Sequence, residues 1–332
     1  MRNLTIGAGY VKALLELAVS KGASRRVLLE RAGINPNELE NRDNRIPLDS
    51  YQALMAAGKS LCQEPALGLL LGEAASLSDV SIVGLICKCS ASNVEIFKQI
   101  NRFGRLVVEV DGHKASGRFK MMRDHHDFWM VDTRSNPNRF PELTDSAFAM
   151  MMSMQVSAGY PSCAKAVHFT HAEPVDRKEY DRIINAPIVF GSDKNAILID
   201  VNLMSLKLPE PDGYAFGVFS EKAEALLLSL QNSKTVRGQV ESLLIPILHT
   251  GKWNMKEIAE TLGFGRQTLY RKLKAEDTNF ERLVDELRHK MAEQYLNGKK
   301  ASVNEIAYLT GYSEPSAFSR AYKRWTGKSP TL

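Results

Sequence analysis

Residues 304–330 read NEIAYLTGYSEPSAFSRAYKRWTGKSP, and this stretch decides how the C-terminal part of the chain folds. Its apolar residues recur at helical intervals, and Gly311 interrupts them. The cations in its second half are Arg320, Lys323, Arg324 and Lys328. Two interpretations fit this pattern. Either two helices pack together and expose a solvated basic face, or they form a helix-turn-helix that reads DNA.

An internal repeat distinguishes the two interpretations. The segment IAETLGFGRQTLYRKL begins at residue 258, and IAYLTGYSEPSAFSRA begins at residue 306, 48 positions later. Gly263 and Gly311 occupy the same place in the two copies. A first helix that ends at a glycine with positive φ, followed by a tight turn and a crossing second helix, is the template of a helix-turn-helix. The duplication therefore favours two such motifs.

The alignment of the two copies makes further predictions. With this offset Tyr270 corresponds to Phe318, and Ser313 is expected to cap the N-terminus of the last helix. The joining segment, residues 279–296, is apolar along one helical face. A rigid helix there would hold the two motifs at a constant separation. Because one turn of DNA is about 34 Å long, two recognition helices so far apart can enter successive major grooves.

The charge of the chain is concentrated in this region. Residues 250–332 carry 15 Lys and Arg against 10 Asp and Glu, which accounts for the whole net charge of +5. Residues 1–249 are neutral overall. An anionic partner such as double-stranded DNA is therefore expected at the C-terminal end.

The outward positions of the second helix in each copy are the candidate DNA contacts. In the first copy these are Arg266, Gln267, Tyr270, Arg271 and Lys274. In the second copy they are Ser313, Glu314, Ser316, Ser319, Arg320 and Lys323. Arg pairs with guanine and Gln with adenine, while Ser and Lys hold phosphates. Phosphate positioning explains the same residues, so the choice between base and phosphate stays open.

The N-terminal part has a different pattern. Its first hundred residues are mostly helical, and apolar runs at residues 106–110, 115–121 and 128–133 then predict antiparallel strands. A Met-rich helix follows at residues 142–157. We therefore predict an α+β domain of helices plus an antiparallel sheet, followed by an all-α domain with two helix-turn-helix motifs.

Composition suggests where these domains meet. Pro and Gly residues near the end of the range 1–213 mark the boundary of the first domain. A helical linker is predicted at 214–249 and the DNA-binding domain at 250–332. The linker has one apolar stripe that either forms a homodimer or packs against its own domain; it consists of Ala223, Leu226, Leu227 and Leu230.

The sequence AFAMMMSMQ, residues 147–155, is the most suggestive apolar stretch upstream. Methionines make an adaptable wall for a small apolar ligand. The same pattern is also that of an ordinary core helix. Residues that bind a ligand are not identified by the sequence.

Neither metal nor cofactor chemistry is expected. The four cysteines lack C-x-x-C spacing, and His168 and His171 would point to opposite faces of a strand. The adjacent residues His125 and His126 are expected in a turn, and no other candidate metal ligand follows them at the spacing of a known metal site. No catalytic motif is present, and no apolar run approaches the roughly 20 residues that cross a bilayer. The sequence thus predicts a cytoplasmic protein that is not an enzyme and has no membrane partner.

Three phrases resemble a known family: IAETLGFGRQTLYRKLK, FERLVDELRHKMAEQYL and VNEIAYLTGYSEPSAFSRAYKRWTGKSP. Residues 252–330 look like the AraC/XylS-type DNA-binding domain. Residues 20–210 resemble, more weakly, the sensing domain of its ornithine-regulator branch, best at APIVFGSDKNAILIDVNLMSLKLPEPD. One departure is Gly265, where the family commonly places a serine N-cap.

This resemblance implies a sequence-specific DNA-binding transcription regulator, usually an activator. A small-molecule effector on its N-terminal domain would control it, with promoter DNA, RNA polymerase and a second copy of the chain as partners. Two alternatives remain open. One is a regulator controlled by a protein partner, and the other is a DNA-modifying repair protein that carries a fused helix-turn-helix and needs a reactive cysteine.

Overall fold

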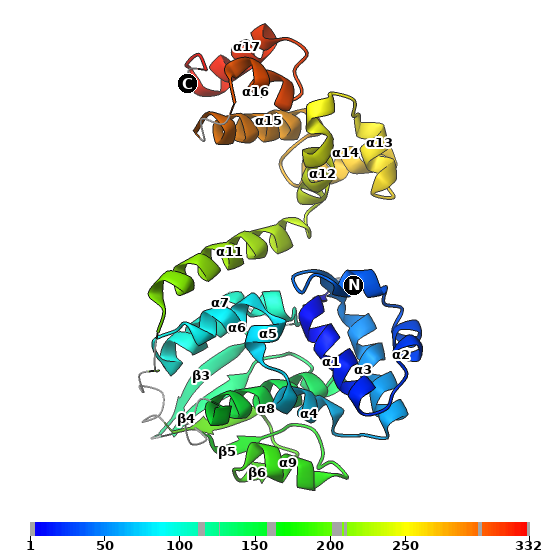
Figure 1. Cartoon of the computed structure of the whole chain (residues 1–332), viewed down its shortest axis with the longest axis vertical. Coiled ribbons are helices and arrows are strands. Elements are labelled where there is room, and N and C mark those ends of the chain that lie inside the picture. Colours follow the sequence, from blue (N-terminus) through cyan, green and yellow to red (C-terminus); the bar gives the residue numbers. More distant parts are fainter. Residues whose placement is uncertain are drawn as a thin grey trace. The chain divides into compact units, whose positions relative to one another are not determined.

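The computed structural model describes residues 4–111, 117–125, 127–157, 164–200, 208, 211–297 and 301–330. The chain divides into two compact units, called here unit 1 (Met1–Leu227) and unit 2 (Leu228–Leu332) (Figure 1). The division falls inside the long helix α11 (Gly213–Asn232). The finer domain boundaries at residues 213 and 249 stay predictions.

Unit 1 combines short helices with two sheets. In its described part the α-helices that precede α11 are α1 (Ala8–Ser20), α2 (Arg25–Ala32), α3 (Leu48–Cys62), α4 (Leu67–Ala74), α5 (Leu77–Val80), α6 (Ile82–Lys88), α7 (Asn93–Val107), α8 (Glu142–Ser157) and α9 (Arg177–Ile184). Figure 1 shows α1, α2 and α3 together at one end of the unit. Gly68 and Gly72 let α4 approach α8 closely, since a Cβ on Gly72 would lie 2.3 Å from the carbonyl oxygen of Ser146.

The main sheet has the strand order β3-β4-β7-β5-β6. Its strands are β3 (Phe119–Asp124), β4 (Asp127–Asp132), β5 (Ala164–His168), β6 (Ile188–Val189) and β7 (Ala196–Ile199). All neighbours pair antiparallel except β5 and β6, which run parallel. A separate antiparallel pair joins β1 (Thr5–Gly7) to β2 (Arg45–Pro47). The predicted class, helices with an antiparallel sheet before an all-α domain, is confirmed.

One predicted strand is wrong. Residues 106 and 107 end helix α7, and Val108 forms only an isolated bridge to Ile6. The helical spacing of Ile96, Ile100 and Phe103 continues to this end, and a short apolar run suits the end of a buried helix as well as a strand. The strand predicted at 115–121 begins at residue 119, and residues 112–116 lie outside the described part.

Helix α8 lies between two hydrophobic cores. Met150 belongs to the core of the first helices, whereas Phe148 and Met152 belong to the core of the sheet. Met150 and Met152 are thus core residues, as one of the two interpretations predicted, whereas Met151 and Met154 are half-buried. On α11, Ala223 is buried in the first core, with Leu226 and Leu227 packed against it, so this part of the apolar stripe packs against its own unit.

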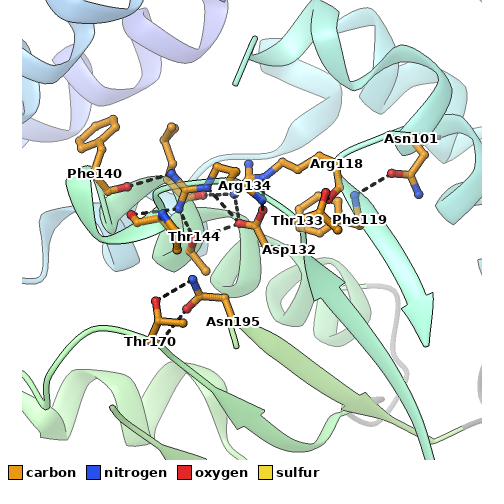
Figure 2. A network of polar contacts seen from close by, with 12 residues as sticks. Asn101, Arg118, Phe119, Asp132, Thr133, Arg134, Phe140, Thr144, Thr170 and Asn195 are labelled. Carbon is orange, nitrogen blue, oxygen red and sulfur yellow. Dashed lines mark hydrogen bonds and ion pairs between the residues drawn. The ribbon is translucent and has the colours of Figure 1, made fainter. Parts of the chain in front are cut away.

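A buried polar network connects the sheet to α8 (Figure 2). Asp132 accepts hydrogen bonds from Nη2 of Arg118 at 2.7 Å and from Nε of Arg134 at 3.2 Å. Arg118 also donates to the carbonyl oxygen of Leu143 at 2.9 Å. Burial alone would raise the pKa of Asp132, but the charge and hydrogen bonds of Arg118, followed by the charge of Arg134, hold it at about 2. This network is a buried structural element in which one carboxylate pairs with two guanidinium groups.

Unit 2 is helical in its described part. After α11 it contains α12 (Val236–Leu244), the 3-10 helix η3 (Ile245–Thr250), α13 (Met255–Thr261), α14 (Arg266–Ala275), α15 (Phe280–Asn297), α16 (Val303–Leu309) and α17 (Pro315–Thr326). One core lies beneath α12 to α15, and a second lies between α15, α16 and α17. The segment 279–296 is the connecting helix that its apolar face predicted.

Candidate nucleic-acid interface

The first helix-turn-helix consists of α13 and α14. Asn254 caps α13, and its Oδ1 accepts hydrogen bonds from the backbone N–H groups of Lys256 and Glu257, both at 3.0 Å. Gly263 turns the chain with φ of +71°. The N–H of Phe264 then donates to the carbonyl oxygen of Ala259 at 2.8 Å, which closes the turn before α14 begins.

The second helix-turn-helix, α16 and α17, repeats this construction. Ser302 and Glu305 form a capping box at the start of α16. Gly311 has φ of +79°, and the N–H of Tyr312 donates to the carbonyl oxygen of Ala307 at 2.9 Å. The two turns therefore close through equivalent hydrogen bonds at the predicted offset.

The start of α17 differs from the prediction. Glu314 is the N-cap, and Ser313 lies one residue before it. Pro315 is the reason, because proline suits the first position of a helix and the residue before it takes the cap. The turn of the second motif is consequently one residue longer than that of the first, where α14 follows Gly265.

This extra residue changes the alignment of the recognition helices α14 and α17. The N–H of Leu269 donates to Gly265, and the N–H of Phe318 donates to Glu314, so these helices correspond at an offset of 49. Leu269 and Phe318 are both fully buried, whereas Tyr270 is 45% exposed. The predicted equivalence of Tyr270 with Phe318 is therefore wrong.

The corrected alignment pairs the candidate cations. Arg271 now corresponds to Arg320, and Lys274 corresponds to Lys323. The candidate side chains are exposed except for Ser319, which is half-buried; the exposed ones are Arg266, Gln267, Tyr270, Arg271, Lys274, Ser313, Glu314, Ser316, Arg320 and Lys323. The two recognition helices thus share exposed cations at two equivalent positions.

The candidate cations are available to an external anion. Within the described ranges, Arg266 and the two pairs of equivalent cations form no ion pair with a carboxylate of the chain. Arg324 differs, because its Nη2 lies 2.7 Å from Oδ2 of Asp285 on α15. Unpaired cations on exposed helix faces are the arrangement that phosphate contacts require.

Arg288 on α15 holds the two motifs together, and sequence reasoning missed it. Its Nε donates to the carbonyl oxygen of Thr310 at 3.0 Å, and its Nη2 donates to that of Gly311 at 2.9 Å. Its guanidinium lies 4.3 Å from the ring centre of Tyr312 and 5.3 Å from that of Trp253. It therefore contacts both halves of unit 2: the first half, which contains η3 and the first motif, through Trp253, and the second half through the turn between α16 and α17.

A signal for Arg288 existed in the sequence. The residue stands four positions after Val284 and four before Ala292, both of which are buried. A cation on the apolar face of a helix needs acceptors or an aromatic partner. Gly311 also brings the second turn close to η3, because a Cβ placed on Gly311 would lie 2.2 Å from the carbonyl oxygen of Leu248 in η3.

The other chemistries have no matching site in the described ranges. No group of three or more His, Cys, Asp or Glu side chains is placed to hold a metal ion there. Burial raises the pKa of the Cys87 thiol to about 12, and Sγ of Cys62 donates to the carbonyl oxygen of Ala18. His126 and Cys163 lie outside the described residues. None of the helices described is long and apolar enough to span a bilayer.

Comparison with known proteins gives matches along almost the whole chain. The profile of the arabinose-binding N-terminal domain of AraC transcription regulators matches residues 22–208, and that of a helix-turn-helix domain matches residues 255–332. The ornithine utilization regulator of Pseudomonas aeruginosa is 24% identical over 331 residues, which cover 98% of this chain and 95% of that protein.

A second curated relative and a solved structure also match this chain. The HTH-type transcriptional regulator VirS of Mycobacterium tuberculosis is 25% identical over 97% of this chain and 93% of its own length. The crystal structure of the transcriptional regulator CdpR from Pseudomonas aeruginosa covers 92% of this chain and 94% of its own, with 19% identity and a TM-score of 0.41. The N-terminal profile alone spans more than half of the residues, so the chain belongs to the AraC family of transcription regulators and is not an enzyme.

Proposed function

We propose that this regulator binds a specific site in double-stranded promoter DNA through both helix-turn-helix motifs. A small-molecule effector bound to unit 1 controls it, and the DNA-bound form activates transcription together with RNA polymerase. The protein acts as a homodimer in the cytoplasm, where the promoter DNA lies. Physically, the effector needs only to bind the DNA-competent state more tightly than the other state.

The observation that supports DNA binding is the equivalence of the two recognition helices. Arg271 and Arg320 occupy the same position of α14 and α17, are exposed, and lack carboxylate partners in the described ranges. Arg288 and Gly311 hold the two motifs together through direct contacts. A rigid pair of basic helices is suited to two neighbouring grooves on one face of DNA.

Fluorescence anisotropy with DNA from the region upstream of its own gene tests this proposal. Arg320→Ala is expected to weaken specific binding by about 5- to 150-fold, which corresponds to about 1–3 kcal/mol. Arg324→Ala is the matched control, because it removes the same charge from the same helix but Arg324 is paired with Asp285. Equal losses in both variants would contradict the assignment.

The same assay separates base contacts from phosphate contacts. If Arg320 reads a base, Arg320→Ala weakens binding to the specific site and leaves binding to random DNA unchanged. If it contacts a phosphate, both fall alike. Effector control is tested by screening metabolites for a rise in the Tm of the full chain, and the absence of any response would favour control by a protein partner.

A further inference from the structure

Two small pockets lie side by side along α8 in unit 1. Each has a volume of about 80 Å³. The first lies between α7 and α8, and its lining includes Tyr10, Val83, Gly104, Arg118, Ala147 and Met150. The second lies between α7, α8 and the sheet, and its lining includes Asn93, Phe97, Met130, Gln155 and Ile199. Ile100, Met151 and Met154 line both pockets.

The chemistry of the first pocket disfavours water. A volume of about 80 Å³ is enough for several waters, each of which needs roughly 10–15 Å³ of such space and two to four polar partners. Tyr10 and Arg118 are the polar side chains of its wall. Arg118 is already hydrogen-bonded to Asp132 (Figure 2) and donates also to the carbonyl oxygen of Leu143. An apolar occupant is therefore favoured.

The second pocket contains a buried polar atom that lacks a hydrogen-bond partner among the described residues. Nε2 of Gln155 donates to Oδ1 of Asn93 at 3.2 Å. Oε1 of Gln155 is buried and has no hydrogen-bond partner among the described residues. Buried carbonyl oxygens nearly always accept a hydrogen bond, so this atom calls for a donor from an occupant.

The wall between the pockets is adaptable. Three side chains line both pockets, Ile100, Met151 and Met154. The two methionines can change conformation at little cost. If both side chains turn aside, the two pockets become one elongated site. Their combined volume is close to the roughly 150 Å³ of a protein cavity that holds benzene.

We propose that the effector of this regulator is a small, largely apolar molecule with one hydroxyl-type hydrogen-bond donor. Its apolar body occupies the first pocket, and its donor reaches Oε1 of Gln155 in the second. A sugar does not fit, because several hydroxyls would be buried without partners. A charged amino acid does not fit either, because the only cation among the described residues of the two walls, Arg118, is already paired with Asp132. This inference rests on the proposed control by an effector.

Gly104 on α7 provides the decisive variant. A Cβ placed on it would meet no heavy atom within 4 Å, although the residue lines the first pocket. Gly104→Leu therefore adds a side chain at the wall of the pocket without a collision at Cβ, and replacing a helical glycine favours folding. Gly217→Leu is the matched control, since Gly217 is also helical, has the same free space, and lines neither pocket.

The experiment measures the Tm of the full chain with octanol, L-arabinose and L-ornithine as separate probes. We expect octanol to raise the Tm of the wild type and of Gly217→Leu by roughly 3 °C or more. Gly104→Leu, which keeps its own cooperative transition, should lose this shift. Ala147→Leu fills the same pocket from α8 and gives a second reading if Gly104→Leu does not fold.

Three results would overturn the inference. Octanol leaves the wild type unchanged, the octanol shift persists in both filled variants, or only the sugar or the amino acid raises the Tm. Any of these three results can occur in a chain that still binds promoter DNA when binding is measured by fluorescence anisotropy. The proposed DNA-binding function would then remain valid. Failure to bind DNA with the octanol shift intact would overturn that function and leave the ligand site standing.

Discussion

The two turn glycines of unit 2 give a controlled test of how its motifs are joined. Gly263 and Gly311 both have positive φ, at +71° and +79°, so alanine at either position is strained by about 1–2 kcal/mol. Part of this cost is offset, because alanine restricts the unfolded chain by about 0.4–1 kcal/mol. A Cβ on Gly263 meets no atom within 4 Å, and Gly263→Ala should therefore cost roughly 1 kcal/mol.

Gly311→Ala should cost considerably more. Its Cβ would lie 2.2 Å from the carbonyl oxygen of Leu248, well inside ordinary contact distance, so the turn must move away from η3. That movement also disturbs the two hydrogen bonds that Arg288 donates to this turn. We expect a total loss of about 3–5 kcal/mol in the free energy of unfolding, in the range of severe single substitutions.

Tryptophan fluorescence during urea denaturation measures this difference. The chain has three tryptophans, and Trp253 and Trp325 lie in unit 2. A Trp129→Phe background therefore restricts the signal to unit 2, and both glycine variants are compared in it. Equal destabilisation by Gly263→Ala and Gly311→Ala would refute the claim that the second turn is packed against the first half of unit 2.

Three further predictions follow from other contacts. Arg288→Ala should lower the unfolding free energy of unit 2 by about 2–3 kcal/mol in the same assay, and Arg288→Lys should not restore it, because lysine lacks the planar fork that reaches two carbonyls. Asp132→Asn should cost unit 1 about 3–5 kcal/mol by calorimetry, because it removes the carboxylate that both Arg118 and Arg134 contact. Since the pKa of Asp132 is about 2, the wild type should lose the stability contributed by this carboxylate as the pH falls from about 4 to 2. Burial alone would lower the pKa of His171, but the hydrogen bond and charge of Asp145, the carbonyl oxygen of Ala172 and the charge of Glu142 together raise it. The stability that charged His171 contributes is therefore present below pH 6.5 and is lost as the pH rises through the higher folded pKa. The Tm of unit 1 should fall between pH 6 and pH 9, and a His171→Gln variant with the same pH dependence would contradict this.

The helix-turn-helix motifs were predictable because their information is local. Helical periodicity and a glycine that ends the first helix are both read within about twenty residues. The alignment of the recognition helices was not predictable at the same level. It depends on whether Ser313 or Glu314 caps α17, and a single residue in the turn moves every outward side chain to a new partner.

The errors in unit 1 have a related cause. Residues 106–110 form a short apolar run, and such a run is compatible with either a strand or the end of a buried helix. Only the preceding turns of α7, with Ile96 and Ile100 at helical spacing, distinguish the two. The pockets and the contacts of Arg288 depend on residues far apart in the chain, and no local pattern describes them.

The salt dependence of DNA binding tests the central claim most directly. The claim is that exposed cations of both recognition helices contact one duplex; these are Arg266, Arg271, Lys274, Arg320 and Lys323. Each phosphate contact contributes about −0.9 to the slope of log K against log salt concentration. We predict a slope of roughly −4 to −5 on promoter DNA, reduced by about one in Arg271→Ala and in Arg320→Ala if each contacts a phosphate. A slope near zero, or a slope and affinity that respond to changes in only one of the two helices, would contradict the account.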